Sequence, residues 1–107
     1  MHSLIIRDRK DVARILKFLF HVRGRLRKLI LERCWLGKDG NALLLRIVEL
    51  CPDLEVLSLE GCHPLTSAGY RLIAYLKKLS ELNLSYCQVH YLCVKLLVTC
   101  VCICERM

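Results

Sequence analysis

One pattern, Leu-x-x-Leu-x-Leu-x-x-Cys, occurs three times in this chain and constrains its fold more than any other feature. It is present in "LRKLILERC" at 26–34, "LEVLSLEGC" at 54–62 and "LSELNLSYC" at 79–87. Aligning Leu29, Leu57 and Leu82 gives steps of 28 and 25 residues, and a further step of 25 residues back reaches Leu4 in "SLIIR". A period of roughly 20 to 50 residues is typical of folds built from stacked units. The sequence therefore predicts about four units.

Each unit combines two periodicities. In "LEVLSLE", Leu57 and Leu59 alternate with polar or small neighbours, which predicts a short strand with one buried face. Apolar residues then recur at intervals of three and four, which predicts helices over 11–22, 41–51 and 67–78. Asp11 and Ser67 are expected at helix starts, and Pro52 is expected just after the end of the second helix.

The order strand, helix, strand decides how the units stack. Parallel strands need a crossover connection, and a helix supplies it with a right-handed path. The sequence therefore predicts an α/β solenoid with parallel strands on a concave face and helices on a convex face. Cys34, Cys62 and Cys87 follow the strands, where a thiol fills a small apolar space and is expected to donate weakly to a neighbouring loop carbonyl.

These motifs resemble the cysteine-containing leucine-rich repeats of F-box/leucine-rich-repeat proteins. The resemblance covers about residues 3–90, and its best unit is Cys51-Pro52-Asp53-Leu54, Leu57-x-Leu59-x-x-Cys62 and Leu65-Thr66-Ser67-Ala68-Gly69-Tyr70. The segment 34–43 looks more like the ribonuclease-inhibitor type. Residues 23–26 and 76–79 lack the Cys-Pro pair, Arg9 replaces the first cysteine, and no segment is left for an F-box. The resemblance implies a recognition surface, as in the substrate-recognition segment of a ubiquitin-ligase adaptor.

The side chains that alternate with the buried leucines are the candidates for binding a protein partner. They are expected to point out of the concave face, accompanied by Ser3 and Ile5 at its edge. The candidate residues are Arg7, Lys28, Ile30, Glu32, Val56, Ser58, Glu60, Glu81, Asn83 and Ser85.

The charge distribution supports a second hypothesis. The chain has a net charge of +7, and residues 1–38 contain 11 of the 17 Lys and Arg but only 3 of the 10 Asp and Glu. Such an excess is typical of faces that meet nucleic acid, anionic lipid or an acidic protein, although it is also found on ordinary solvated faces. No aromatic residues interleave with "RGRLRKL" at 23–29, as single-strand binding would require.

The cysteines and histidines suggest chemistry only weakly. Cys62-His63 and Cys87-x-x-His90 combine residue types used in zinc sites and in nucleophilic dyads. The repeat already accounts for these cysteines, and the sequence has no paired carboxylates, phosphate-binding glycine loop or HExxH helix. We therefore expect no catalytic activity, no metal site and no cofactor.

The apolar segment 91–107 follows a predicted repeat domain over 1–90. A stripe that includes Leu92, Leu96 and Cys100 favours a final helix that closes the last repeat. Metal capture by Cys100, Cys102 and Cys104, lipidated cysteines and a poorly ordered end are the alternatives. The stretch 89–104 is shorter than the about 18 residues of a membrane span.

The start of the chain, "MHSLIIRDRKD", lacks the apolar core of a signal peptide. We therefore expect a cytoplasmic or nuclear protein with reduced thiols. Neither end of the repeat has a convincing polar cap, which leaves self-association through the ends open.

Overall fold

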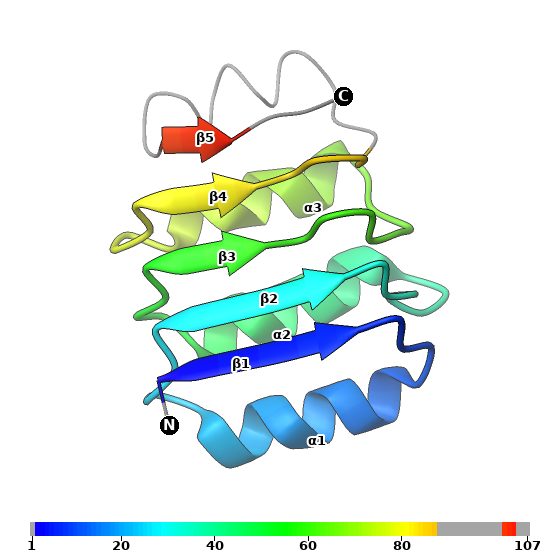
Figure 1. Ribbon diagram of the computed structural model, residues 1–107, viewed down its shortest axis with the longest axis horizontal. Helices are drawn as coiled ribbons and strands as arrows, with labels where there is room; N and C mark the ends of the chain where they lie inside the picture. The colour runs from blue at the N-terminus through cyan, green and yellow to red at the C-terminus, as the bar shows by residue number, and fades with distance from the viewer. Residues whose placement is uncertain (1, 88–101, 105–107) are drawn as a thin grey trace.

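The computed structural model describes residues 2–87 and 102–104. It shows an α/β arrangement in which every neighbouring pair of strands is parallel and the sheet order follows the chain. The strands are β1 (Ser3–Arg7), β2 (Lys28–Glu32), β3 (Val56–Ser58), β4 (Glu81–Asn83) and β5 (Cys102–Cys104). The helices α1 (Val12–Val22), α2 (Gly40–Leu50) and α3 (Ser67–Leu72) lie on one side of the sheet (Figure 1).

The strand register is the one that the repeat predicts. Leu4, Leu29, Leu57 and Leu82 are aligned across four strands, and the last three are fully buried. Hydrogen bonds continue the ladder beyond the short strands, from Leu59 N to Asn83 O at 2.9 Å and from Arg33 N to Glu60 O at 2.8 Å. The leucine column therefore forms the core between the sheet and the helices.

Two of the three predicted helices are confirmed within a residue at either end. Asp11 caps α1 by accepting a hydrogen bond from Arg14 N at 3.2 Å. Asp39 was not predicted as a cap. Its side chain caps α2 by accepting hydrogen bonds from the N–H groups of Asn41 and Ala42. These carboxylates satisfy N–H groups that have no partner within the helix.

The third helix differs from its prediction in length and cap. It ends at Leu72 and continues only as a 3-10 turn, Ile73–Tyr75, so the predicted helix over 67–78 is too long. Thr66 occupies the N-cap position, and Ser67 is the first helical residue instead of the cap. The Thr66 hydroxyl accepts a 2.6 Å hydrogen bond from Asn41 Nδ2 and thereby joins the starts of α2 and α3.

The turns that follow β1, β2, β3 and β4 share one backbone feature. The residue just before the cysteine position has a positive φ in all four turns: 55° at Asp8, 51° at Arg33, 66° at Gly61 and 60° at Tyr86. A left-handed residue at this point ends the strand and sends the chain toward the helix layer.

The cysteines tie these turns to the preceding strand. Cys34 Sγ donates to Ile6 O at 3.6 Å, Cys62 Sγ to Leu31 O at 3.1 Å and Cys87 Sγ to Leu59 O at 2.8 Å. The acceptor belongs to the neighbouring unit each time. The predicted bond from each thiol to a neighbouring carbonyl is present, but the acceptors Ile6 and Leu31 lie within strands, so the expected loop carbonyl is wrong for Cys34 and Cys62.

The C-terminal segment contains a strand where a helix was expected. Residues 102–104 form β5, with Ile103 opposite Leu82, so the helix prediction is wrong for these residues. The β-branched Val101 and Ile103 alternate with cysteine, a pattern that suits a strand. The rest of the predicted helix, including Leu92, Leu96 and Cys100, lies outside the described residues. None of the described helices has the length and apolar character of a membrane span.

Candidate binding surface

The helices leave one face of the sheet uncovered (Figure 1). The predicted binding residues are aligned in rows across its strands. The strand register fixes which side chains are neighbours. One row contains Ser3, Lys28, Val56 and Glu81, and the next contains Ile5, Ile30, Ser58 and Asn83. A third row begins with Arg7 opposite Glu32 and leads to Glu60 and Ser85 in the next two turns. The sheet therefore brings all the predicted residues to one face.

The predicted binding residues differ in how far their side chains are exposed to solvent. Lys28, Glu81 and Arg7 are exposed, and Ile5 is 49% exposed. Ile30, Glu32, Val56, Glu60 and Asn83 are partly buried. The accessible part of the face is therefore both apolar and charged.

Two predicted binding residues are not accessible, and this part of the prediction is wrong. Ser58 is only 6% exposed and Ser85 only 2% exposed. Ser58 lies between Ile30 and Asn83 in its row, and the longer side chains beside it shield its short one. The N–H of Ser85 donates to Asn83 Oδ1 at 2.9 Å within the turn after β4. Both serines shape the face without offering contact area.

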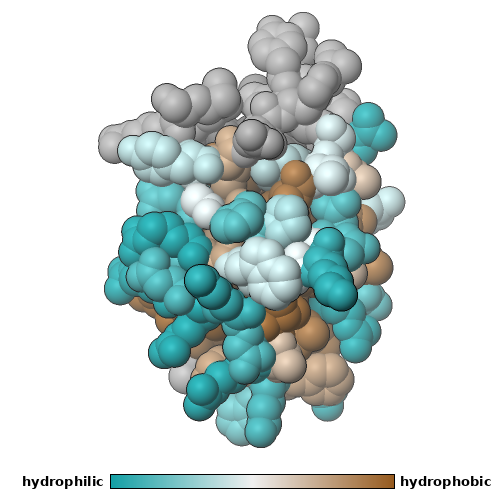
Figure 2. Space-filling view, turned by 90° about the vertical axis from the view of Figure 1, so that its right-hand side faces the viewer, coloured by the Kyte–Doolittle hydropathy of each residue, from teal (hydrophilic) through white to brown (hydrophobic). Residues whose placement is uncertain are grey.

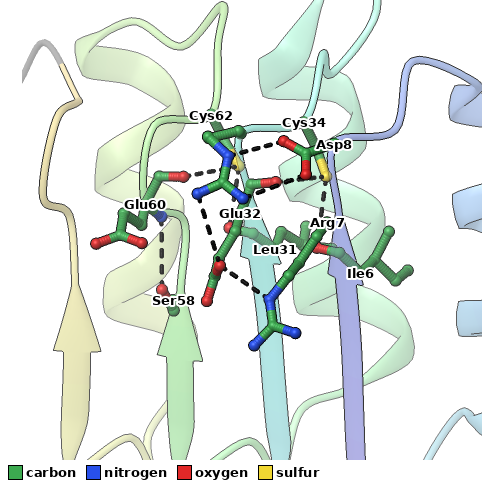
Figure 3. A network of polar contacts seen from close by, with 10 residues as sticks. Ile6, Arg7, Asp8, Leu31, Glu32, Cys34, Ser58, Glu60 and Cys62 are labelled. Atoms are coloured by element: carbon green, nitrogen blue, oxygen red, sulfur yellow. Dashed lines mark hydrogen bonds and ion pairs between the residues drawn. The ribbon is translucent and has the colours of Figure 1, made fainter.

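A network of ion pairs lies at the carboxyl ends of β1 and β2 (Figure 3). Glu32 Oε2 lies 3.0 Å from Arg7 Nε and 3.9 Å from Arg33 Nη1. Arg33 also donates two hydrogen bonds to the Asp8 carboxylate, at 2.7 and 3.2 Å. The Arg33 guanidinium holds the pKa of Asp8 below its ordinary value. These exposed pairs add little stability, but they hold the side chains in defined positions.

Three of the buried thiols are unsuited to nucleophilic chemistry. Burial raises the pKa of Cys62 to about 12 and that of Cys51 to about 11. Burial also raises the pKa of Cys87. A thiol is reactive as the thiolate, so these groups are inert near neutral pH.

The histidine beside Cys62 does not share its surroundings. Cys62 is buried, whereas His63 is exposed and pairs through its backbone with Trp35. Within residues 2–87, no three His, Cys, Asp or Glu side chains are grouped closely enough to hold a metal ion. His90 and the side chains of the tail cysteines lie outside the described residues.

A groove beside β1 was not foreseen from the sequence. It has a volume of about 750 Å³ and lies between the end of β1, the start of α1 and Trp35. Its apolar lining includes Ile6, Ile15 and Phe18, and its rim includes Arg9, Lys10 and Arg14. Figure 2 looks along the strands onto the turns that follow them, and shows hydrophobic surface between hydrophilic side chains toward the end that carries β1.

A second hollow adjoins this groove. It measures about 420 Å³ and is lined by Lys10, Arg33, Trp35 and His63. The excess of basic residues in the N-terminal part of the sequence pointed to this region as a possible binding surface. No local sequence pattern indicated that Trp35 or Phe18 would lie next to these basic residues. Only the stacking of the first two units brings these residues together.

Comparisons with protein-family models, curated proteins and solved structures gave no match.

Proposed function

We propose that this chain is a protein-recognition module without catalytic activity, built as a leucine-rich-repeat solenoid of about four units. The observation that carries the proposal is the alignment of exposed side chains in rows across parallel strands. Stacked units of this kind use their extended strand surfaces for binding. Adjacent strands lie about 4.8 Å apart, so the backbone fixes the spacing of the contacts.

The composition of the rows indicates the kind of partner. Ile5, Ile30 and Val56 provide apolar contact area, whereas Lys28 and Glu81 place opposite charges on either side of Val56. A complementary surface would combine an apolar centre with an acidic group near Lys28 and a basic group near Glu81. Charge complementarity of this type sets orientation and association rate more than total affinity.

The paired arginines favour protein recognition over nucleic-acid binding. Arg7 and Arg33 are engaged with Glu32 and Asp8, and Arg27 lies 3.8 Å from Asp53 and 3.7 Å from Glu55. The contacts of Arg27 with Asp53 and Glu55 offset part of the N-terminal basic excess, whereas Glu32 and Asp8 place negative charge among the basic residues of the same segment. They leave a mixed surface instead of the continuous cationic stripe that phosphate binding exploits.

The resemblance to F-box/leucine-rich-repeat proteins extends the proposal. We infer a role like that of a substrate-recognition segment of a ubiquitin-ligase adaptor, acting in the cytoplasm or nucleus. The buried, free thiols of Cys34, Cys51, Cys62 and Cys87 suit a reducing compartment.

Paired variants on the two faces test the proposal. Affinity capture from a cell lysate, followed by mass spectrometry, identifies a partner, whose affinity is then measured by titration. Ile30→Asp combined with Val56→Asp should weaken binding at least about tenfold, because charges replace apolar contacts at the centre of the face. Leu45→Asp is the matched control, since Leu45 is a 44% exposed side chain on α2.

Circular dichroism should show that each variant remains folded. The proposal is wrong if Leu45→Asp abolishes binding while the concave-face variant binds normally. It is equally wrong if all binding disappears at moderately raised salt and a DNA oligonucleotide competes for it.

A further inference from the structure

The first strand has one open edge in the part of the chain that the structure describes. β1 pairs with β2 on one side, and the sheet order gives it no described neighbour on the other. Such an edge presents a row of backbone donors and acceptors to any added strand. Peptides commonly bind proteins by extending a sheet in this way.

The hydrogen bonds to β2 identify which backbone groups face the open edge. Lys28 N donates to His2 O and Asp8 N donates to Glu32 O, both at 2.9 Å. Because residues of a parallel strand bond alternately to either side, the even-numbered residues of β1 face β2. The N–H and C=O groups of Ser3, Ile5 and Arg7 therefore point toward the open edge.

The groove beside β1 lies next to this edge. Ile6 and Ile15 are buried against the rest of the core, whereas Phe18 on α1 is 47% exposed. In a stacked fold, the face of each unit is covered by the next one. Here the inner face of the first unit forms a pocket that an apolar side chain of an added strand would enter.

The charges around the groove select its occupant. The groove lining also contains the carboxylates of Asp8, which is paired with Arg33, and of Asp11, which caps α1 and keeps its negative charge. Arg9, Lys10 and Arg14 form no ion pair with any residue of 2–87. Three cations thus face two carboxylates, one of which is already paired with Arg33, so the rim has a net positive charge and attracts an acidic segment.

The same charges argue against a second copy of this chain. A second copy would bring another rim with a net positive charge, and each chain has a net charge of +7, so the charges oppose pairing between copies. A duplex nucleic acid supplies negative charge but neither a strand backbone nor an apolar side chain for the pocket.

We propose that the open edge of β1 and the adjoining groove bind an acidic, extended segment of a partner protein. The segment pairs with Ser3, Ile5 and Arg7 as an added strand. An apolar side chain of the segment packs against Ile6, Ile15 and Phe18, and its carboxylates face Arg9, Lys10 and Arg14. This site is distinct from the concave rows and does not depend on the function proposed for them.

Synthetic peptides provide the test. The probe is a fluorescent seven-residue peptide of alternating glutamate and valine, titrated with the full chain and followed by anisotropy. Three control peptides each remove one feature: lysine replaces glutamate, serine replaces valine, or proline replaces the central residue. We expect the glutamate–valine peptide to bind and each control to bind at least about tenfold more weakly.

Variants of the protein test the same features separately. Ile5→Pro removes one outward N–H, and edge strands tolerate proline, whereas Ile5→Ala keeps the N–H and serves as its control. Lys10→Glu with Arg14→Glu reverses the rim charge, and Arg71→Glu with Lys77→Glu makes the same charge change elsewhere. Ile5→Pro and the rim variant should each lower the affinity for the peptide at least about tenfold. The affinities of their control variants should lie within about twofold of the wild-type value.

Phe18→Ser removes an apolar side chain from the groove without altering the strand, so it should also weaken peptide binding.

Three outcomes would overturn the proposal. The first is an absence of peptide binding at all concentrations. The second is equal binding of a DNA oligonucleotide, insensitive to Ile5→Pro and Phe18→Ser, which would indicate a general polyanion site. The third is a dimer, detected by analytical ultracentrifugation, that Ile5→Pro abolishes. The concave-face variant should bind the peptide normally, which separates this test from that of the proposed function.

Discussion

Replacing Cys62 by alanine tests whether buried thiols control stability at alkaline pH. Cys62 is 3% exposed, and its Sγ donates to Leu31 O at 3.1 Å. Burial raises its pKa from 9.0 to about 12. The folded chain therefore holds the thiol proton more tightly than the unfolded chain does.

The sign and size of the effect follow from proton linkage. A group with a raised pKa contributes its full stabilisation below its unfolded pKa, and the stabilisation is lost as the pH rises toward the folded pKa. For Cys62 the window runs from about 9 to about 12. Within it, the free energy of unfolding falls by at most about 1.4 kcal/mol per pH unit for one thiol. Between pH 8 and pH 10 the loss due to Cys62 is about 1.4 kcal/mol.

Urea unfolding at pH 8 and pH 10, with a reducing agent present, measures this loss. At pH 8, Cys62→Ala should be less stable than the wild type by about 1 to 2 kcal/mol, because it loses packing and a buried hydrogen bond. Its further loss on going to pH 10 should nevertheless be smaller than that of the wild type by about 1.4 kcal/mol. Leu57→Ala is the control, since it is destabilised but keeps every thiol. Equal pH-dependent losses in the wild type and Cys62→Ala would refute the argument.

Two further predictions concern the ladder and its turns. Leu57→Ala should lower the free energy of unfolding by about 2 to 5 kcal/mol, because it leaves a cavity in the core. Val56 is partly exposed, so Val56→Ala should lower it by less than about 1.5 kcal/mol. Chemical denaturation measures both changes. Gly61 has a φ of 66°, so Gly61→Val should cost about 1 to 3 kcal/mol, and Gly61→Asn should cost clearly less. Equal melting temperatures for the two Gly61 variants would contradict the left-handed assignment.

The strand ladder could be predicted because its signal is local and repeated. Alternating leucines in "LEVLSLE" specify which face is buried, and copies 25 and 28 residues apart specify the neighbours. The role of the cysteines followed from the same alignment. Each thiol lies in the turn beyond the ladder, within hydrogen-bonding distance of a carbonyl of the preceding unit.

The features that were missed depend on contacts between units. The Thr66 hydroxyl is bonded to Asn41 Nδ2, a partner 25 residues away that no local capping rule includes. The burial of Ser58 depends on the longer side chains beside it in the row. Likewise, Trp35 meets the first helix only because the first two units stack, so the groove beside β1 has no signature in the sequence.

The positive φ in these turns could not be predicted from the sequence, because only one of the four residues is a glycine. Asp8, Arg33 and Tyr86 adopt the same conformation with full side chains. Aspartate tolerates this region better than most residues, but arginine and tyrosine give no such indication. The N–H groups of Asp8, Arg33 and Gly61 all donate to a carbonyl of the next unit, so contacts between units accompany this conformation whichever residue adopts it.

The glycine at 61 also affects the candidate binding face one unit away. A Cβ at this position would lie 3.2 Å from Cγ of Arg33, which is closer than most such contacts. The space left by the missing side chain lets the Arg33 stem pass beside the turn and reach Asp8 and Glu32. Gly61→Asn should therefore keep the backbone conformation yet displace Arg33. The pKa of Asp8, which Arg33 lowers, should then rise toward its ordinary value in an NMR titration. An unchanged Asp8 pKa in a folded Gly61→Asn variant would show that Arg33 does not need this space.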